Sequence, residues 1–302
     1  MNNQYNGHLC IVFALEHYNP LNMIRALGEN GINPIYISVK RRYEVATKSK
    51  YISKLFRVDS VPEGFRLLME KYGCLVEETG KKPYIVFSDD KSVGYFDEHY
   101  DEWKDKFITY NAGCSGRINK FMDKYKIQQL AKKHGFNVLD SYVVSKKDKL
   151  PENLWYPIIT KDISPNSGSW KGDVYICQNE KELKEAIVKI ESPLVMIQHF
   201  VDKQNEMALE GYTINKGKEM QIITEMKWKY LIQGYYSPYH DVKMFEDKDM
   251  EAKLQAMFEE IGFEGVFEVE FLIDKKGTYY FMETNFRASA WNPTCKFAGM
   301  PL

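Results

Sequence analysis

The sequence lacks the features that define several classes of protein. Its five cysteines are scattered, and no pair has the spacing of a zinc knuckle or a redox motif, so neither a disulfide framework nor a structural metal is expected. No apolar run approaches the ~20 residues of a membrane span. The formal net charge of −1 argues against a general nucleic-acid binder, which would carry a basic excess.

Other absences narrow the location and the chemistry. No basic region precedes the apolar run at residues 9–15 and no small-residue cleavage site follows it, so a signal peptide is not predicted and a cytoplasmic or at most peripheral location is expected. The six histidines form no ligand-spaced set, and none is proposed as catalytic or metal-binding. His240 and its tyrosine neighbours could line a substrate cleft or simply pack.

Glycine is missing where a dinucleotide-binding domain needs it. The first predicted strand, residues 9–15, runs into Glu16-His17-Tyr18-Asn19-Pro20. A pyrophosphate-binding turn requires glycines there, because only they let the backbone approach the phosphates closely. The turn therefore argues against NAD or FAD at this position, and the absence of a GxxxxGK[ST] sequence excludes a P-loop.

What the sequence does contain predicts an α/β protein of more than one unit. Hydrophobic residues make up 44% of the 302 positions, enough to fill a sizeable core. Residues 8–110 alternate between strand and helix patterns, which predicts a small doubly wound parallel sheet. Its expected strands are residues 9–15, 33–39 and 84–87, and its expected helices are residues 22–29 and 65–72.

Two further units are expected downstream, so that the chain divides into residues 1–115, 116–193 and 194–302. The second would hold a helix at 120–134, strands at 142–145, 156–162 and 174–177, and a helix at 181–190. The third would hold strands at 194–200, 207–215 and 219–227, a helix at 249–261 and a hairpin at 266–285.

The hairpin at 266–285 is the most informative segment. A two-residue loop at Lys276-Gly277 would place Glu270 opposite Glu283, and period-two alternation would put both on one face with Glu268 and Asn285. Directly opposed carboxylates repel each other unless a cation lies between them. Oxygen ligands of this kind suit Mg²⁺. The alternative is a solvated sheet face that carries acids by chance.

The run Glu283-Thr284-Asn285-Phe286-Arg287 resembles the Glu-x-Asn-x-Arg ending of the ATP-grasp superfamily, with Glu270 thirteen residues earlier. The resemblance implies an N-terminal Rossmann-like parallel sheet followed by two ATP-grasp subdomains with antiparallel sheets. It also implies that Glu270, Glu283 and Asn285 bind the Mg²⁺ ions of ATP (two ions, with Mn²⁺ as an alternative). Arg287 would lie near the transferred phosphoryl group.

Upstream segments resemble the remaining parts of this superfamily in order. Lys124 resembles the first nucleotide-contacting lysine, and Lys161, at the end of an apolar strand, resembles the second. Lysines suit phosphate charge as point cations. The small-residue loop at 164–172 resembles the phosphate-covering loop. Its candidate contacts are Ser167, Gly168, Lys171 and Gly172.

The run at 195–201 resembles the hinge strand between the two grasp subdomains. The resemblance implies that backbone groups near its end read the adenine edge, and that Glu206 holds the ribose hydroxyls. Many relatives have a glutamate where this chain has His199. Glu210 is either a second contact or an exposed acid on a strand. The candidate hinge residues are Gln198, His199, Phe200 and Val201.

The superfamily chemistry is phosphorylation of a carboxylate by ATP and attack of an amine on the acyl phosphate. Phe87-Ser88-Asp89-Asp90 and the helix beginning at Asp123 resemble the D-aspartate-ligase-like carboxylate–amine ligases. The small-residue and Gly-x-Pro tail at 288–301 resembles that of carbamoyl-phosphate-synthase-like members. The alternatives are another ATP-grasp activity, such as a peptide- or metabolite-tailoring ligase, and a nucleotide-binding protein without turnover. Most relatives continue past the metal site, so we expect either a truncated chain or a site completed in a homo-oligomer or by a partner subunit.

Overall fold

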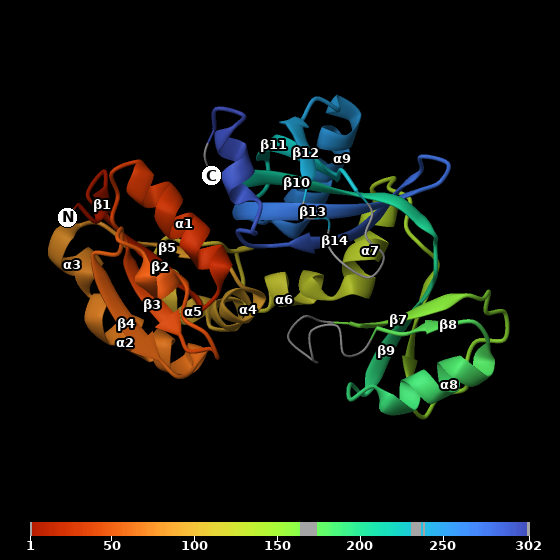
Figure 1. Cartoon of the computed structure of the whole chain (residues 1–302). Coiled ribbons are helices and arrows are strands. Elements are labelled where there is room, and N and C mark those ends of the chain that lie inside the picture. Colours follow the sequence, from red (N-terminus) through yellow and green to blue (C-terminus); the bar gives the residue numbers. More distant parts are fainter. Residues whose placement is uncertain (1, 164–173, 231–236, 238, 301–302) are drawn as a thin grey trace.

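The computed structural model describes residues 2–163, 174–230, 237 and 239–300. These residues form three sheets, each with its own helices (Figure 1). The loop candidates Ser167, Gly168, Lys171 and Gly172 lie outside the described residues. Within the described part of the chain, no helix is both long enough and apolar enough to cross a bilayer.

The N-terminal unit is built around a parallel sheet in the order β4-β3-β2-β5. Strand β2 has an uninterrupted buried run from Leu9 to Ala14, because helices cover both faces of a parallel sheet. The strands are β1 (Gln4–Tyr5, antiparallel to β2), β2 (His8–Leu15), β3 (Ile35–Val39), β4 (Lys54–Val58) and β5 (Tyr84–Phe87). The helices are α1 (Tyr18–Glu29), η1 (Ala46–Lys48), α2 (Val61–Tyr72), α3 (Leu75–Thr79), α4 (Asp90–Glu98) and α5 (Tyr100–Trp103).

The helix expected at 120–134 is broken at Asp123 into α6 (Arg117–Met122) and α7 (Lys124–Lys133). Asp123 has extended backbone angles, and its carboxylate accepts a hydrogen bond from the Lys126 amide (2.9 Å), so it caps α7. Both helices lie beside β14 and belong to the main core. The break makes Lys124 the first residue of α7.

A small antiparallel sheet in the order β6-β9-β7-β8 forms the second unit, with α8 (Glu180–Lys189) on one face. Its strands are β6 (Ser141–Ser145), β7 (Ile158–Asp162), β8 (Ile176–Cys177) and β9 (Leu194–His199). β9 pairs with both β6 and β7, although the expected third segment began at Leu194. Backbone pairing therefore assigns this strand to the small sheet.

The third unit is an antiparallel sheet in the order β12-β11-β10-β13-β14. Helix α9 (Lys248–Ile261) packs on one face, where the rings of Phe258 and Phe267 lie 4.4 Å apart. The opposite face carries the acids described below. The strands are β10 (Lys203–Ile214), β11 (Glu219–Trp228), β12 (His240–Met244), β13 (Gly265–Asp274) and β14 (Tyr279–Asn285), followed by η2 (Asn292–Lys296).

Candidate active site on the antiparallel sheet

Strands β13 and β14 pair so that the predicted acids face each other. Glu270 lies opposite Glu283, and Glu268 lies opposite Asn285. The predicted two-residue loop is wrong, however. The turn at 274–278 is longer, and the Asp274 carboxylate accepts hydrogen bonds from two amides of the turn. As a result, the pairs nearest the turn are displaced by one residue from the predicted register.

A β-bulge at Met282 cancels this displacement. Phe271 pairs with Phe281, whereas Glu270 pairs with Glu283, so Met282 is an extra residue on β14. Side chains alternate between the two faces of a strand, so an uninterrupted register would have pointed Glu283 into the core. The bulge thus brings Glu283 onto the same face as Glu270.

Strand β10 adds more acids to this surface. Its pairing with β13 sets Glu210 opposite Glu268 and Glu206 opposite Leu272, so both acids point to the side of Glu270. We call the surface formed by Glu206, Glu210, Glu268, Glu270, Glu283 and Asn285 the acid face. Period-two alternation on three neighbouring strands is therefore what gathers the carboxylates.

Asn285 and Arg287 connect the acid face to the N-terminal unit. The Asn285 side-chain amide donates to Glu268 (2.8 Å) and Glu270 (3.0 Å), while its oxygen accepts from Arg287 (3.1 Å). Arg287 also donates through Nε to Asp90 at the start of α4 (3.0 Å). The sequence predicted only that Arg287 would lie near the transferred phosphoryl group. In the structure, Arg287 also contacts Asp90.

The two predicted phosphate lysines reach the same place from different elements. Lys124, at the start of α7, forms an ion pair with Glu283 (2.5 Å). Lys161, on β7 of the small sheet, donates to the side-chain oxygen of Gln198 (2.9 Å). Lys161 interacts electrostatically with both Lys124 and Glu283. The structure thus brings both lysines to the acid face.

Burial and neighbouring charge perturb the titration of these groups strongly. Burial, followed by the charges of Glu283 and Glu268, raises the pKa of Glu270 well above its ordinary value. Burial acts against the charged form of Glu283 as well, but Lys124 outweighs it and lowers the pKa of Glu283. Burial and the nearby Lys124 lower the pKa of Lys161 to about 8.

Glu210 is a structural anchor and not an exposed acid. It is fully buried, and it accepts hydrogen bonds from the Ser289 hydroxyl and from the Asn292 side-chain amide (2.7 Å). Burial and the neighbouring Glu268 raise its pKa well above the ordinary value. Glu210 therefore fixes the segment that follows Arg287 onto the acid face.

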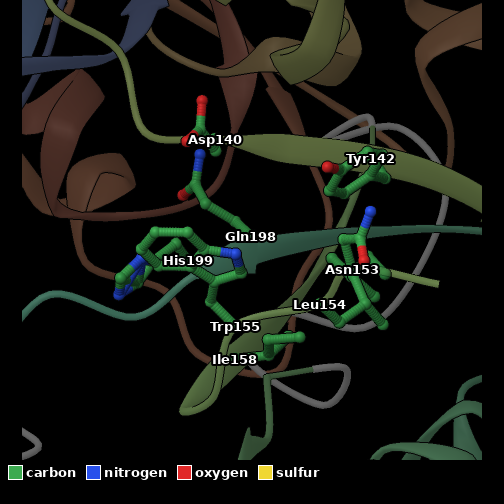
Figure 2. A pocket seen from close by; sticks show the side chains of 9 residues that line it. Asp140, Tyr142, Asn153, Leu154, Trp155, Ile158, Gln198 and His199 are labelled. Atoms are coloured by element: carbon green, nitrogen blue, oxygen red, sulfur yellow. The ribbon is translucent and has the colours of Figure 1, made fainter. Parts of the chain in front are cut away.

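The predicted hinge residues lie at the end of β9. The Phe200 amide donates to the Pro157 carbonyl (2.9 Å), so this group is already engaged within the small unit. Gln198 and His199 border a cavity with about 390 Å³ of empty space (Figure 2). Its other lining residues are Asp140, Tyr142, Asn153, Leu154, Trp155, Ile158 and Ile197.

A second cavity, with about 380 Å³ of empty space, lies on the acid face. Glu206, Glu268 and Glu270 line it together with aromatic side chains. The sequence leaves the role of one of them undecided and gives no indication of the others. The undecided side chain is that of His240, and its ring lies 4.1 Å from that of Trp291. The remaining lining residues are Met207, Ala208, Met226 and Trp228.

Sequence reasoning also missed Gln128. This residue on α7 is almost completely buried, and its side chain hydrogen-bonds both Gln198 and the Met282 carbonyl (2.9 Å each). A signal was present, because Gln128 follows Lys124 by four residues and therefore lies on the same face of the helix.

Three comparisons with known proteins gave different results. No model of a known protein family matches the sequence. A curated D-alanine–D-alanine ligase from Fusobacterium nucleatum is 25% identical over 171 residues, which are 54% of this chain and 55% of that ligase. The chain thus spans about half the length of this relative.

Solved structures resemble nearly the whole chain. The L-amino acid ligase from Bacillus licheniformis has a TM-score of 0.70 and 12% identity, and the match covers 95% of this chain and 69% of that one. The chain has the ATP-grasp fold. The resemblance predicted from the sequence is therefore confirmed at the level of the fold.

Two further ATP-grasp structures superpose similarly. An N5-carboxyaminoimidazole synthetase from Staphylococcus aureus has a TM-score of 0.66 and 19% identity, covering 96% of this chain and 73% of that one. The biotin carboxylase domain of a 2-oxoglutarate carboxylase from Hydrogenobacter thermophilus has a TM-score of 0.65 and 17% identity. The match covers 95% of this chain and 66% of that one. That domain was solved as a dimer with MgADP, ADP and bicarbonate.

Proposed function

We propose that this ATP-grasp chain binds Mg·ATP on the acid face and uses it to activate a carboxylate for attack by an amine. The observation that carries the proposal is the pairing of Glu270 with Glu283 on one face, beside Asn285 and next to Lys124. The proposed partners are therefore ATP, a small carboxylate and an amine. An amino acid is a candidate for either substrate.

The donor set of the acid face fits Mg²⁺. Among the side chains that the structure describes, no three of His, Cys, Asp and Glu form a ready-made metal cluster. Mg²⁺ does not require one, because it commonly takes one or two protein carboxylates and completes its shell with phosphate oxygens and water. Glu270, Glu283 and the Asn285 oxygen would hold the ion, which would neutralise phosphate charge when bound.

The cationic side chains have separate proposed tasks. Lys124 and Lys161 would bind ATP phosphates, and Arg287 would stabilise charge on the phosphoryl group in transfer. Since Arg287 is held by Asp90 and Asn285 in this structure, we propose that its contacts change when nucleotide binds. Glu206 would hold the ribose, and the carbonyl of Phe200 and the backbone of Val201 would read the adenine.

The proposed reaction has two balanced steps. An oxygen of the substrate carboxylate attacks the γ-phosphorus of ATP, the bond to the ADP oxygen breaks, and an acyl phosphate forms. The amine nitrogen then attacks the acyl carbon, inorganic phosphate leaves with the bonding electrons, and the nitrogen loses a proton. The protein contributes position and charge, as in other phosphoryl transfers.

The proposal is tested by measuring ADP release with Mg·ATP and pairs of amino acids, after a thermal-shift screen has selected candidate substrates. We expect substrate-dependent ADP release that Glu283→Ala reduces at least about a hundredfold, since the charge that it removes acts in a partly buried site. Glu259→Gln, an exposed position on α9, is the matched control. Undiminished turnover in Glu283→Ala contradicts the proposal, and nucleotide binding without turnover points to a non-catalytic protein.

A further inference from the structure

Three hydrogen bonds link the small sheet to the acid face through two buried glutamines. Lys161 donates to the Gln198 oxygen, the Gln198 amide donates to the Gln128 oxygen, and the Gln128 amide donates to the Met282 carbonyl. Each bond is 2.9 Å long, and both glutamines are 1% exposed. We call this chain of contacts the glutamine relay.

The direction of the relay is fixed by its two ends. An ammonium group can only donate a hydrogen bond, and a backbone carbonyl can only accept one. Lys161 therefore requires the oxygen of Gln198, and Met282 requires the amide nitrogen of Gln128. If either side-chain amide were rotated by 180°, its nitrogen would face another donor or its oxygen would face another acceptor. Only one arrangement therefore satisfies Lys161, both glutamines and the Met282 carbonyl.

The far end of the relay is the residue that sets the register of the acids. Met282 is the extra residue of the bulge, and the bulge places Glu283 on the face of Glu270. The extra residue of a bulge is left out of the regular ladder. Gln128 provides a partner for its carbonyl from α7, one helical turn after Lys124, which itself contacts Glu283.

We propose that Gln128 is a positioning residue that couples the phosphate-binding lysine of the small sheet to the metal-binding acid of the large sheet. The inference rests on the proposed function. Gln128 touches neither nucleotide nor metal; it orients Gln198, which holds Lys161, and it holds the bulge that orients Glu283. The same side chain thus sets the spacing between two groups that must act on one triphosphate.

The test compares Gln128→Met with Gln129→Met. Methionine keeps the length and flexibility of the buried side chain without its hydrogen bonds. Gln129 is exposed on the same helix, so its replacement controls for effects on α7. Binding of Mg·ADP is measured by calorimetry from pH 6.5 to 9.5, and thermal unfolding reports whether each variant is folded.

We expect Gln128→Met to unfold cooperatively and to bind Mg·ADP at least about tenfold more weakly than wild type, because a displaced Lys161 would lose a hydrogen bond to a charged phosphate oxygen. Its affinity should also begin to fall at a lower pH, because a Gln198 that is no longer oriented supports the charged form of Lys161 less well. Gln129→Met should match wild type in both respects.

The following outcomes would refute the inference or the proposed function on which it rests. Wild-type protein that fails to bind Mg·ADP refutes the proposed function, and the inference with it. Wild-type binding with an unchanged affinity and pH profile in Gln128→Met refutes the inference alone. If Gln128→Met does not fold, Gln128→Glu decides. While burial keeps its carboxyl group protonated, this residue can accept from Gln198 and donate to the Met282 carbonyl, so it should bind Mg·ADP as wild type does at pH 6.5 and lose affinity more steeply than wild type as the pH rises and it ionises. Weak binding at every pH, or failure of this variant to fold, would refute the inference.

Discussion

At the scale of single residues, the acids of the sheet differ in how their charge is balanced. Glu283 contacts the ammonium group of Lys124, whereas Glu270 accepts a hydrogen bond from the amide of Asn285. An amide donor offsets buried negative charge less than a cation does. Burial and the like charges nearby therefore raise the pKa of Glu270, and its ionised form destabilises the nucleotide-free protein.

Glu270→Gln should therefore stabilise the nucleotide-free protein while abolishing turnover. Because the pKa of Glu270 is higher in the folded than in the unfolded state, its penalty develops as the pH rises above the unfolded value and persists at neutral pH. We expect Tm to rise by roughly 2–4 °C at pH 7.5 and to change little near pH 4, where the carboxyl group is protonated in the folded state and largely protonated in the unfolded state. Differential scanning calorimetry at both pH values tests this. An equal shift in the Glu259→Gln control would rule out the explanation.

Lys161 should make nucleotide affinity pH-dependent. Its pKa of about 8 in the free protein means that the ammonium form, to which we assign phosphate binding, is lost as the pH rises above that value. Affinity for Mg·ADP should then weaken by up to about tenfold per pH unit, because each binding event must take up a proton. Calorimetry in buffers of different ionisation enthalpy measures the uptake. Lys161→Met should bind weakly with little dependence on pH between 8 and 9.5, and a steep dependence in that variant would assign the titration elsewhere.

At the scale of elements, the hydrophobic periodicity predicted the strands and helices that frame the site. It did not predict the break at Asp123, because Lys124–Lys133 continues the apolar pattern and the capping hydrogen bond becomes visible only in three dimensions. It also missed β4 and β12. Only one of the five residues of β4 is buried and most of β12 is exposed, so neither strand shows a buried run.

The pairing of Glu270 with Glu283 was predicted correctly, although the turn from which it was predicted was wrong. The sequence indicated Lys276-Gly277 as a two-residue loop, but hydrogen bonds to Asp274 enlarge the turn. The bulge at Met282 then restores the predicted pair. Contacts made by residues distant in sequence, such as Arg287 with Asp90, carry no local signal and could not be predicted.

The cap of α7 should affect binding as well as stability. Asp123→Ala removes the capping hydrogen bond and should cost about 1 kcal/mol of stability. Because Lys124 begins that helix, the same change should weaken Mg·ADP binding. Asp247→Ala, which removes the equivalent cap of α9 on the other side of the sheet, is the matched control. Urea unfolding and calorimetry together test the pair; comparable losses of affinity in the two variants would contradict a specific role for the α7 cap.

At the scale of the whole molecule, the segment after β14 joins the antiparallel sheet to the N-terminal unit. The Ala288 amide donates to the carbonyl of Phe87, the last residue of β5 (3.2 Å), and Asn22 on α1 donates to the Ala290 carbonyl (3.1 Å). Through these contacts and the bond of Arg287 to Asp90, the carboxyl end of β5 lies beside the acid face. In open α/β sheets, ligands bind at this edge.

Asp90 should contribute to the joining of these two units. Asp90→Asn removes the nearer of two carboxylate partners of the largely buried Arg287, whose other partner, Glu268, lies 3.9 Å away, and should cost about 1–3 kcal/mol of unfolding free energy. Glu29→Gln removes the exposed ion pair between α1 and Lys296, which links the same two units, and should produce no measurable change. Urea unfolding of both variants provides the comparison. Equal effects would show that Arg287 has no special role in the connection.

The bulge at Met282 also affects how relatives of this chain can be recognised. Glu270 and Glu283 are thirteen residues apart, and one of those residues is the extra one in β14. A homologue with the same turn but a regular second strand would need an interval of twelve to present the same two carboxylates. A motif search with a fixed interval would therefore separate proteins that present the same pair of carboxylates in space.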